Sequence, residues 1–155
     1  MDSYKVQAVN MTQSTGHKKY VIGDVSTAGT YTYDWKLPAG AIVEKINVLN
    51  KVVFNQGTSA AIKVGDMADD DKFLVSTNIK ASAARTESAV AQQMQSITPY
   101  TGGASAENEY IVRATITTAG SAGNTGELYM WVDYRFDPSS AYVTKTFGET
   151  SVTEA

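Results

Sequence analysis

The chain has 155 residues and a formal net charge of −3, and it contains no cysteine. This length corresponds to one domain, and the absence of cysteine excludes thiol catalysis. No basic patch is visible that would suit nucleic acid. No apolar run reaches the length of a membrane span, and the N-terminus lacks the apolar segment of a signal peptide, so we expect synthesis in a cytoplasm.

Residues 1–29 are weakly patterned and predict an N-terminal arm with one or two edge strands. Its first part carries apolar side chains that are too few to form a core. A segment of this kind can become ordered on a partner. The predicted partner-binding residues of the arm are Tyr4, Val6, Val9 and Met11.

Residues 30–65 predict three strands separated by short breaks at 38–40 and 55–57. In the first strand Tyr31, Tyr33, Trp35 and Leu37 share one face, because side chains alternate along a strand. We expect the three strands to form an antiparallel meander. In the second strand the even positions from Ile42 to Phe54 are predicted to face the core. A helical stripe through Ile42, Ile46, Leu49 and Val53 is the alternative, which the β-branched content disfavours.

An acidic turn follows at Asp66–Asp71. Asp66, Asp69, Asp70 and Asp71 could bind calcium through oxygen ligands, but their spacing differs from that of an EF-hand loop. We interpret the stretch as a solvated turn and predict no metal. After a short strand near Phe73, residues 78–100 leave two alternatives open. Ala83, Glu87, Val90 and Met94 fit one helical face, and Gln92–Tyr100 fits a strand.

The pattern becomes regular again near the C-terminus. Tyr110–Ile116 predicts a strand, Ala119–Gly126 a hairpin turn, and Leu128–Phe136 a strand with a continuous apolar face. We therefore predict a domain over residues 30–137 and a C-terminal arm or tail over 138–155. The fold class is all-β: an antiparallel β-sandwich of jelly-roll type with extended terminal arms.

Two aromatic residues of the last strand, Tyr129 and Trp131, lie opposite its apolar face. A strand with one wet side should carry polar residues there, so this second face is predicted to be covered. An arm of the same chain, a neighbouring subunit or a bound sugar could cover it, and packing within the chain remains an equal alternative. We retain Tyr129 and Trp131 as a predicted oligomer or partner interface.

The residues for catalysis are sparse. His17 is the only imidazole, which leaves no basis for a catalytic triad or a zinc site, and we expect it to be exposed to solvent. Paired carboxylates could hydrolyse glycosides without histidine, but nothing in the sequence places two acids across a cleft. The candidates are Asp34, Glu107, Glu109 and Asp133. We predict that the protein is not an enzyme and uses no cofactor.

A family resemblance rests on short segments. Leu37–Val43, Phe54, Gly57–Ala60, Val64–Asp66 and the Gly126–Phe136 strand together resemble small virion proteins of tailed bacteriophages, in particular head decoration (cement) proteins with a jelly-roll domain. The resemblance implies a structural homotrimer on the outer surface of the capsid. It would bind across subunits of the major capsid protein, with terminal arms that reach neighbouring molecules and with no catalytic residues. A carbohydrate- or receptor-binding module of a phage tail or fibre is the alternative, and a small glycosidase is a minor one.

Overall fold

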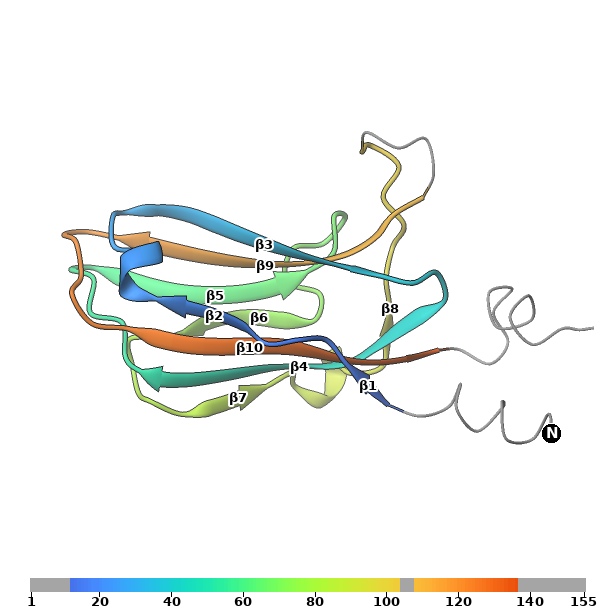
Figure 1. Cartoon of the computed structure of the whole chain (residues 1–155), viewed down its shortest axis with the longest axis horizontal. Helices are drawn as coiled ribbons and strands as arrows, with labels where there is room; N and C mark the ends of the chain where they lie inside the picture. Colours follow the sequence, from blue (N-terminus) through green and yellow to red (C-terminus); the bar gives the residue numbers. More distant parts are fainter. Residues whose placement is uncertain (1–11, 104–107, 137–155) are drawn as a thin grey trace, which may run out of the picture.

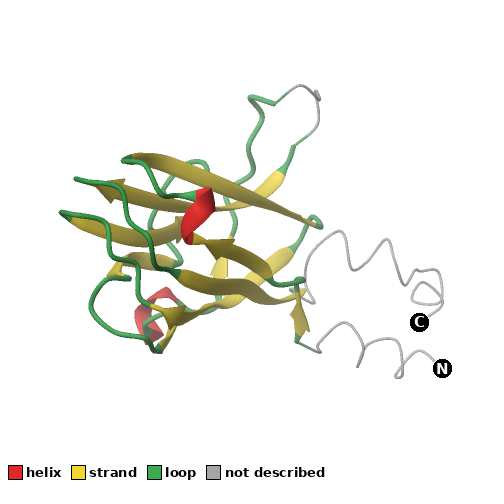
Figure 2. Ribbon diagram, turned by 60° about the vertical axis from the view of Figure 1, so that its left-hand side comes forward, coloured by secondary structure: helices red, strands yellow, loops and turns green. Residues whose placement is uncertain are grey.

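The computed structural model of the protein describes residues 12–103 and 108–136. It contains two antiparallel sheets packed face to face (Figure 1), which confirms the predicted all-β sandwich. Within these described residues, helix is confined to two short 3-10 turns, η1 (Ile22–Asp24) and η2 (Val90–Gln92) (Figure 2). In the described part of the chain, no helix is long and apolar enough to cross a membrane.

The two sheets, called sheet A and sheet B, divide the strands as follows. Sheet A contains β1 (Gln13–Ser14), β2 (Lys18–Val21), β4 (Ala41–Val52), β7 (Arg85–Glu87), β8 (Gln95–Ser96) and β10 (Glu127–Phe136). Its order is β1-β10-β4-β7, with β2 also on β10 and β8 also on β4. Sheet B contains β3 (Gly29–Leu37), β5 (Ser59–Gly65), β6 (Leu74–Asn78) and β9 (Tyr110–Ala119), in the order β3-β9-β5-β6.

The connections between strands correct two predictions. Strands β3, β4 and β5 alternate between the sheets, so the predicted meander over residues 30–65 is wrong. The Ala119–Gly126 turn likewise joins β9 of sheet B to β10 of sheet A and is not a hairpin. A short break such as Pro38–Gly40, where Gly40 has a φ of 87°, serves either kind of connection. The chain thus crosses between sheet A, with six strands, and sheet B, with four, and the jelly-roll type stays a prediction.

The core lies between the sheets and follows the predicted period of two. Leu128, Met130 and Val132 of β10 are fully buried, and the predicted faces of β3 and β9 also point inward. Two residues that precede Thr30, Tyr20 of β2 and Val25, belong to the same core. The domain boundaries at 29/30 and 137/138 stay predictions. The arm residues Tyr4, Val6, Val9 and Met11, and the tail from 138, lie outside the described residues.

Two β-bulges in β4 make its predicted even face only partly right. Lys45 pairs with Asp133 and Val43 with Tyr134, which leaves Glu44 as an extra residue. A second shift lies where Glu127 pairs with Val52 and Leu128 with Asn50. Each extra residue reverses the alternation beyond it. Ala41 and Val43 are therefore buried, whereas Ile42 is not. Between the bulges Ile46 and Val48 are buried as expected, and beyond the second bulge Val52 is 41% exposed.

The segment 78–100 forms no continuous helix from Ala83 to Met94, and of the strand considered over 92–100 only Gln95–Ser96 is a strand. It forms β7, η2 and β8, which lie along β4. The hydroxyl of Ser88 ends β7, because it accepts a hydrogen bond from the backbone of Ile46 and donates one to the carbonyl of Phe73. This buried contact between the two layers favours an irregular path over a continuous element.

Candidate interaction surface

The outer face of sheet A carries the two aromatic residues singled out from the sequence. Trp131 and Tyr129 are half-buried. The ring of His17 lies 4.5 Å from that of Trp131, and the Arg85 guanidinium lies 5.7 Å from the same ring. The Lys19 ammonium lies 5.6 Å from the Tyr129 ring. Side chains of the same chain thus cover part of both rings, and a role for them at a subunit interface stays a prediction.

Two further apolar side chains extend this face. Leu49 pairs with Tyr129 across the β4–β10 ladder and is 38% exposed, and Val52 pairs with Glu127. Sequence analysis missed both as surface residues. The exposure of Leu49 could have been predicted from its odd position, because the even face of this strand was predicted to be buried. Val52 has an even position and turns outward only because of the second bulge. We define Leu49, Val52, Tyr129 and Trp131 as the sheet A patch.

Two groups of ion pairs lie beside the sheet A patch, and each contains one carboxylate and two cations. Glu127 lies 3.1 Å from Lys19 and 3.2 Å from Lys51. Glu87 lies 2.8 Å from Lys45 and 2.9 Å from Arg85. The hydrogen bond with Lys19 lowers the pKa of the Glu127 carboxyl from its ordinary value, and that with Lys45 lowers the pKa of Glu87. A partly apolar face whose charged side chains are held in ion pairs suits contact with protein.

A polar network fastens the middle of the same face. The buried amide of Asn47 accepts a hydrogen bond from Arg85 at 2.9 Å and donates one to Asp133 at 2.9 Å. Asp133 also accepts a hydrogen bond from the Ser14 hydroxyl at 2.6 Å. These bonds connect β7, β4, β10 and β1, so the residues around Trp131 are held by four strands. Asp133, a sequence candidate for glycosidase chemistry, is therefore engaged in the network.

Glu44, the extra residue of the first bulge, binds side chains near both ends of the described chain. Its carboxylate accepts hydrogen bonds from the Thr12 hydroxyl at 2.9 and 2.8 Å and from the Arg135 guanidinium at 2.5 Å. Burial raises the pKa of Glu44, but the bonds from Arg135 and Thr12 outweigh it, and the net pKa is lowered. Thr12 and Arg135, near the two ends of the described chain, therefore lie close together at one end of sheet A.

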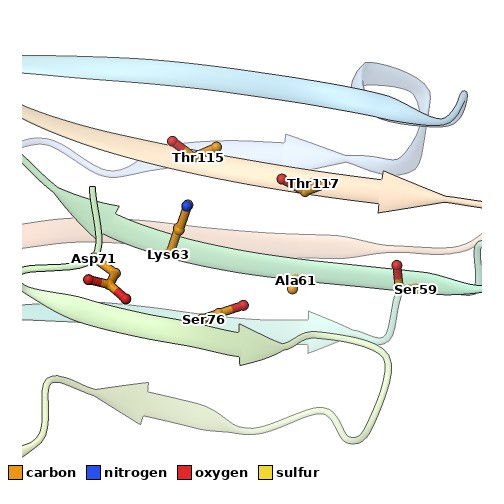
Figure 3. A pocket seen from close by; sticks show the side chains of 7 residues that line it. All are labelled: Ser59, Ala61, Lys63, Asp71, Ser76, Thr115 and Thr117. Carbon is orange, nitrogen blue, oxygen red and sulfur yellow. The ribbon is translucent and has the colours of Figure 1, made fainter. Parts of the chain in front are cut away.

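The outer face of sheet B has a shallow depression of about 330 Å³ over β5, β6 and β9 (Figure 3). Small and hydroxyl side chains line most of it, together with Lys63 and Asp71. The lining residues are Ser59, Ala61, Lys63, Asp71, Ser76, Thr115 and Thr117. The Lys63 ammonium is bound to Asp70 at 2.6 Å, and the carboxylate of Asp71 adds a negative group to the lining.

The acidic turn contains one structural carboxylate and three exposed ones. Buried Asp66 accepts hydrogen bonds from the backbone amides of Ala68, Asp69 and Thr98 and pairs with Lys72 at 3.0 Å. Amides of the turn thus bind one oxygen of Asp66, and Lys72 and Thr98 bind the other. The four-carboxylate calcium set considered from the sequence does not assemble around it. Asp69, Asp70 and Asp71 do lie together with ligand atoms within 4.8 Å, all exposed.

The other residues considered for catalysis have separate partners. Asp34 forms a bidentate pair with Arg113, with N–O distances of 2.6 and 2.7 Å. Glu109 pairs with Lys36 at 2.7 Å. His17 is exposed, as expected, and lies against Trp131. Glu107 lies outside the described residues. The structure therefore does not bring Asp34, Glu109 and Asp133 together across a cleft.

Comparison with known proteins identifies a fold relationship. No protein-family model and no curated protein matches the chain. The structure is similar to a chain of the cyanophage Pam1 capsid asymmetric unit, with a TM-score of 0.52, 15% identity, and coverage of 83% of this chain and 86% of that chain. A second similar chain comes from the acid-stable capsid of Helicobacter pylori bacteriophage KHP30, with a TM-score of 0.46, 23% identity and coverage of 83% and 95%. The first comparison indicates a shared sandwich fold.

Proposed function

We propose that the protein is a structural component of a bacteriophage virion. In this proposal it is a jelly-roll head decoration protein on the outer capsid surface. It binds as a homotrimer across subunits of the major capsid protein and stabilises the shell without catalysis. The observation that carries the proposal is the fold, which is similar to that of a chain in a cyanophage capsid over 83% of the present chain. The sequence resemblance of residues 30–136 to decoration proteins supports it independently.

The surface chemistry is compatible with this role. The sheet A patch is framed by internally paired charges, so attachment through it would depend on shape and apolar contact more than on net charge. Many modest contacts, each bridging two capsid subunits, act together and strengthen the shell. The carbohydrate-binding alternative has weaker support, because His17 and Arg85 already occupy positions over the Trp131 ring.

The test is the temperature at which capsids rupture, measured with and without the purified protein. We expect a higher rupture temperature with the protein, retained in a chelator and in moderate salt, because the contacts are neither metal-bridged nor purely electrostatic. Equal rupture temperatures would refute the decoration role. Protection lost in chelator would instead assign a metal to the exposed carboxylates Asp69, Asp70 and Asp71.

A further inference from the structure

Strand β3 is an edge strand of sheet B, and within the described residues no strand pairs with its outer side. β3 pairs with β9 on one side, and on the other the hydroxyl of Tyr20 donates to the Thr32 carbonyl at 3.4 Å. That is the only outward backbone contact of β3 within residues 12–103 and 108–136. In an antiparallel strand, alternate residues direct their backbone groups to opposite neighbours. The outward carbonyl of Thr32 therefore places the amides of Thr30, Thr32, Asp34 and Lys36 on the open side.

The opposite edge of sheet B is protected, which makes β3 distinctive. On β6 the Gln92 side chain accepts a hydrogen bond from the Val75 amide at 3.4 Å, and the Thr77 hydroxyl donates to the Val75 carbonyl at 2.9 Å. The edges of sheet A are divided among short strands, β1 and β2 on one side and β7 and β8 on the other. β3 by contrast has nine residues without proline. A long unblocked edge is a template for another strand.

The chain itself contains a segment suited to this edge. Residues 142–147 read Tyr-Val-Thr-Lys-Thr-Phe, a run of β-branched and aromatic residues with a single charge. Residues 137–141 separate this segment from Phe136, the last residue of β10. Phe136 pairs with Ala41, and Ala41 directly follows the turn that ends β3. The described chain therefore ends, at Phe136, close to the end of the β3 edge.

We propose that the β3 edge of one copy binds residues 142–147 of a second copy as an added strand. Residues 142–147 could also bind the β3 edge of their own molecule. Residues 137–141, which span at most about 18 Å, would then have to reverse direction and cross between sheets about 10 Å apart. Exchange between copies avoids this path and closes into a ring, which accords with the proposed homotrimer on which the inference rests.

Cysteine cross-linking tests the exchange cleanly, because the full chain has no cysteine. A Thr32→Cys chain is mixed with an affinity-tagged chain that carries Thr144→Cys or Lys145→Cys, so that both faces of the donor are sampled, and the mixture is mildly oxidised. Thr117→Cys is the matched control, since Thr117 is exposed on β9 but lies away from the edge. We expect at least about tenfold more covalent heterodimer with Thr32→Cys than with Thr117→Cys, because the exchange raises the effective concentration.

Hydrogen exchange supplies the second measurement. The amides of Thr30, Thr32, Asp34 and Lys36 should exchange slowly in the oligomer of the full chain and quickly in Thr144→Pro, with Ser151→Pro as control. Heterodimer no more abundant than with Thr117→Cys, or fast exchange at the β3 amides of the unaltered protein, would overturn the proposal. So would a monomeric cross-link in the Thr32→Cys/Thr144→Cys double variant. Because neither measurement uses capsids, failure of capsid binding alone would affect only the proposed function.

Discussion

Asp66 shows at the scale of one residue how a carboxylate can be structural in an acidic run. Its side chain is fully buried, yet three backbone amides and the Lys72 ammonium bind it. Burial raises the pKa of Asp66, and the hydrogen bond from Thr98 followed by those from Lys72, Ala68 and Asp69 lowers it further than burial raises it. The charged form is therefore favoured in the folded state, and it ties the turn after β5 to the segment around Thr98.

We predict that Asp66→Asn destabilises the protein by about 2–4 kcal/mol at neutral pH, since hydrogen bonds to a charged acceptor are lost. Because the folded pKa is lowered, the contribution of Asp66 is present above the unfolded carboxyl pKa of about 3.9 and is lost as the pH falls through the folded value. The difference between the free energies of unfolding of Asp66→Asn and the unaltered protein should therefore shrink in acid.

Urea unfolding at several pH values measures this effect. Asp70→Asn is the matched control, because Asp70 is exposed and paired with Lys63 only at the surface, and it should cost less than about 1 kcal/mol. Equal costs for the two variants, or a cost for Asp66→Asn that does not depend on pH, would contradict the structural role of Asp66.

At the scale of elements, the bulges of β4 decide which of two similar valines supports the core. Val48 lies between the bulges and is 1% exposed, whereas Val52 lies beyond the second bulge and is 41% exposed. We predict that Val48→Thr destabilises by about 1–3 kcal/mol, because a hydroxyl is buried in an apolar core. Val52→Thr should change the stability by less than about 0.5 kcal/mol. Thermal unfolding of both variants decides between this register and an unbroken even face, for which the two costs would be alike.

The same elements explain what could be read from the sequence. Period-two alternation along β3, β9 and β10 predicted their buried faces, because one side of each strand must be apolar wherever it packs in the core. It could not predict the bulges, since inserting Glu44 changes the phase without changing the composition. Nor could it predict the sheet of each strand, because turns such as Pro38–Gly40 serve a hairpin and a crossing equally well. Hence the sandwich was predictable, while the meander and hairpin were wrong.

The candidate surface was less predictable for a related reason. Tyr129 and Trp131 stood out because aromatic residues occupied a face expected to be polar. Their partners His17 and Arg85 come from distant parts of the chain and join them only through the pairing of β10 with β2 and of β4 with β7. Residue type alone also could not separate Asp66 from its exposed neighbours, since burial of that carboxylate depends on amide donors as far away as Thr98.

At the scale of the whole molecule, one end of sheet A determines where both terminal segments begin. Thr12 and Arg135 share the carboxylate of Glu44, and β1 pairs with the end of β10. The two ends of the described chain therefore lie close together on the surface. This geometry suits the proposal that the terminal segments reach molecules beside that end of the sandwich, because both would engage the same neighbourhood.

We predict that the apolar residues of the N-terminal arm contribute to capsid attachment and not to the stability of the sandwich. Replacing Tyr4, Val6, Val9 and Met11 together with serine in the full chain should leave the unfolding midpoint unchanged, since the core and the Thr12–Glu44 bond remain intact. Attachment should weaken, because ordering of the arm would no longer be offset by apolar contact with the partner. The matched control replaces the interleaved polar residues Lys5, Gln7 and Asn10 with serine. Co-sedimentation with undecorated capsids measures the effect, and equal binding of the two variants would remove the arm from the attachment mechanism.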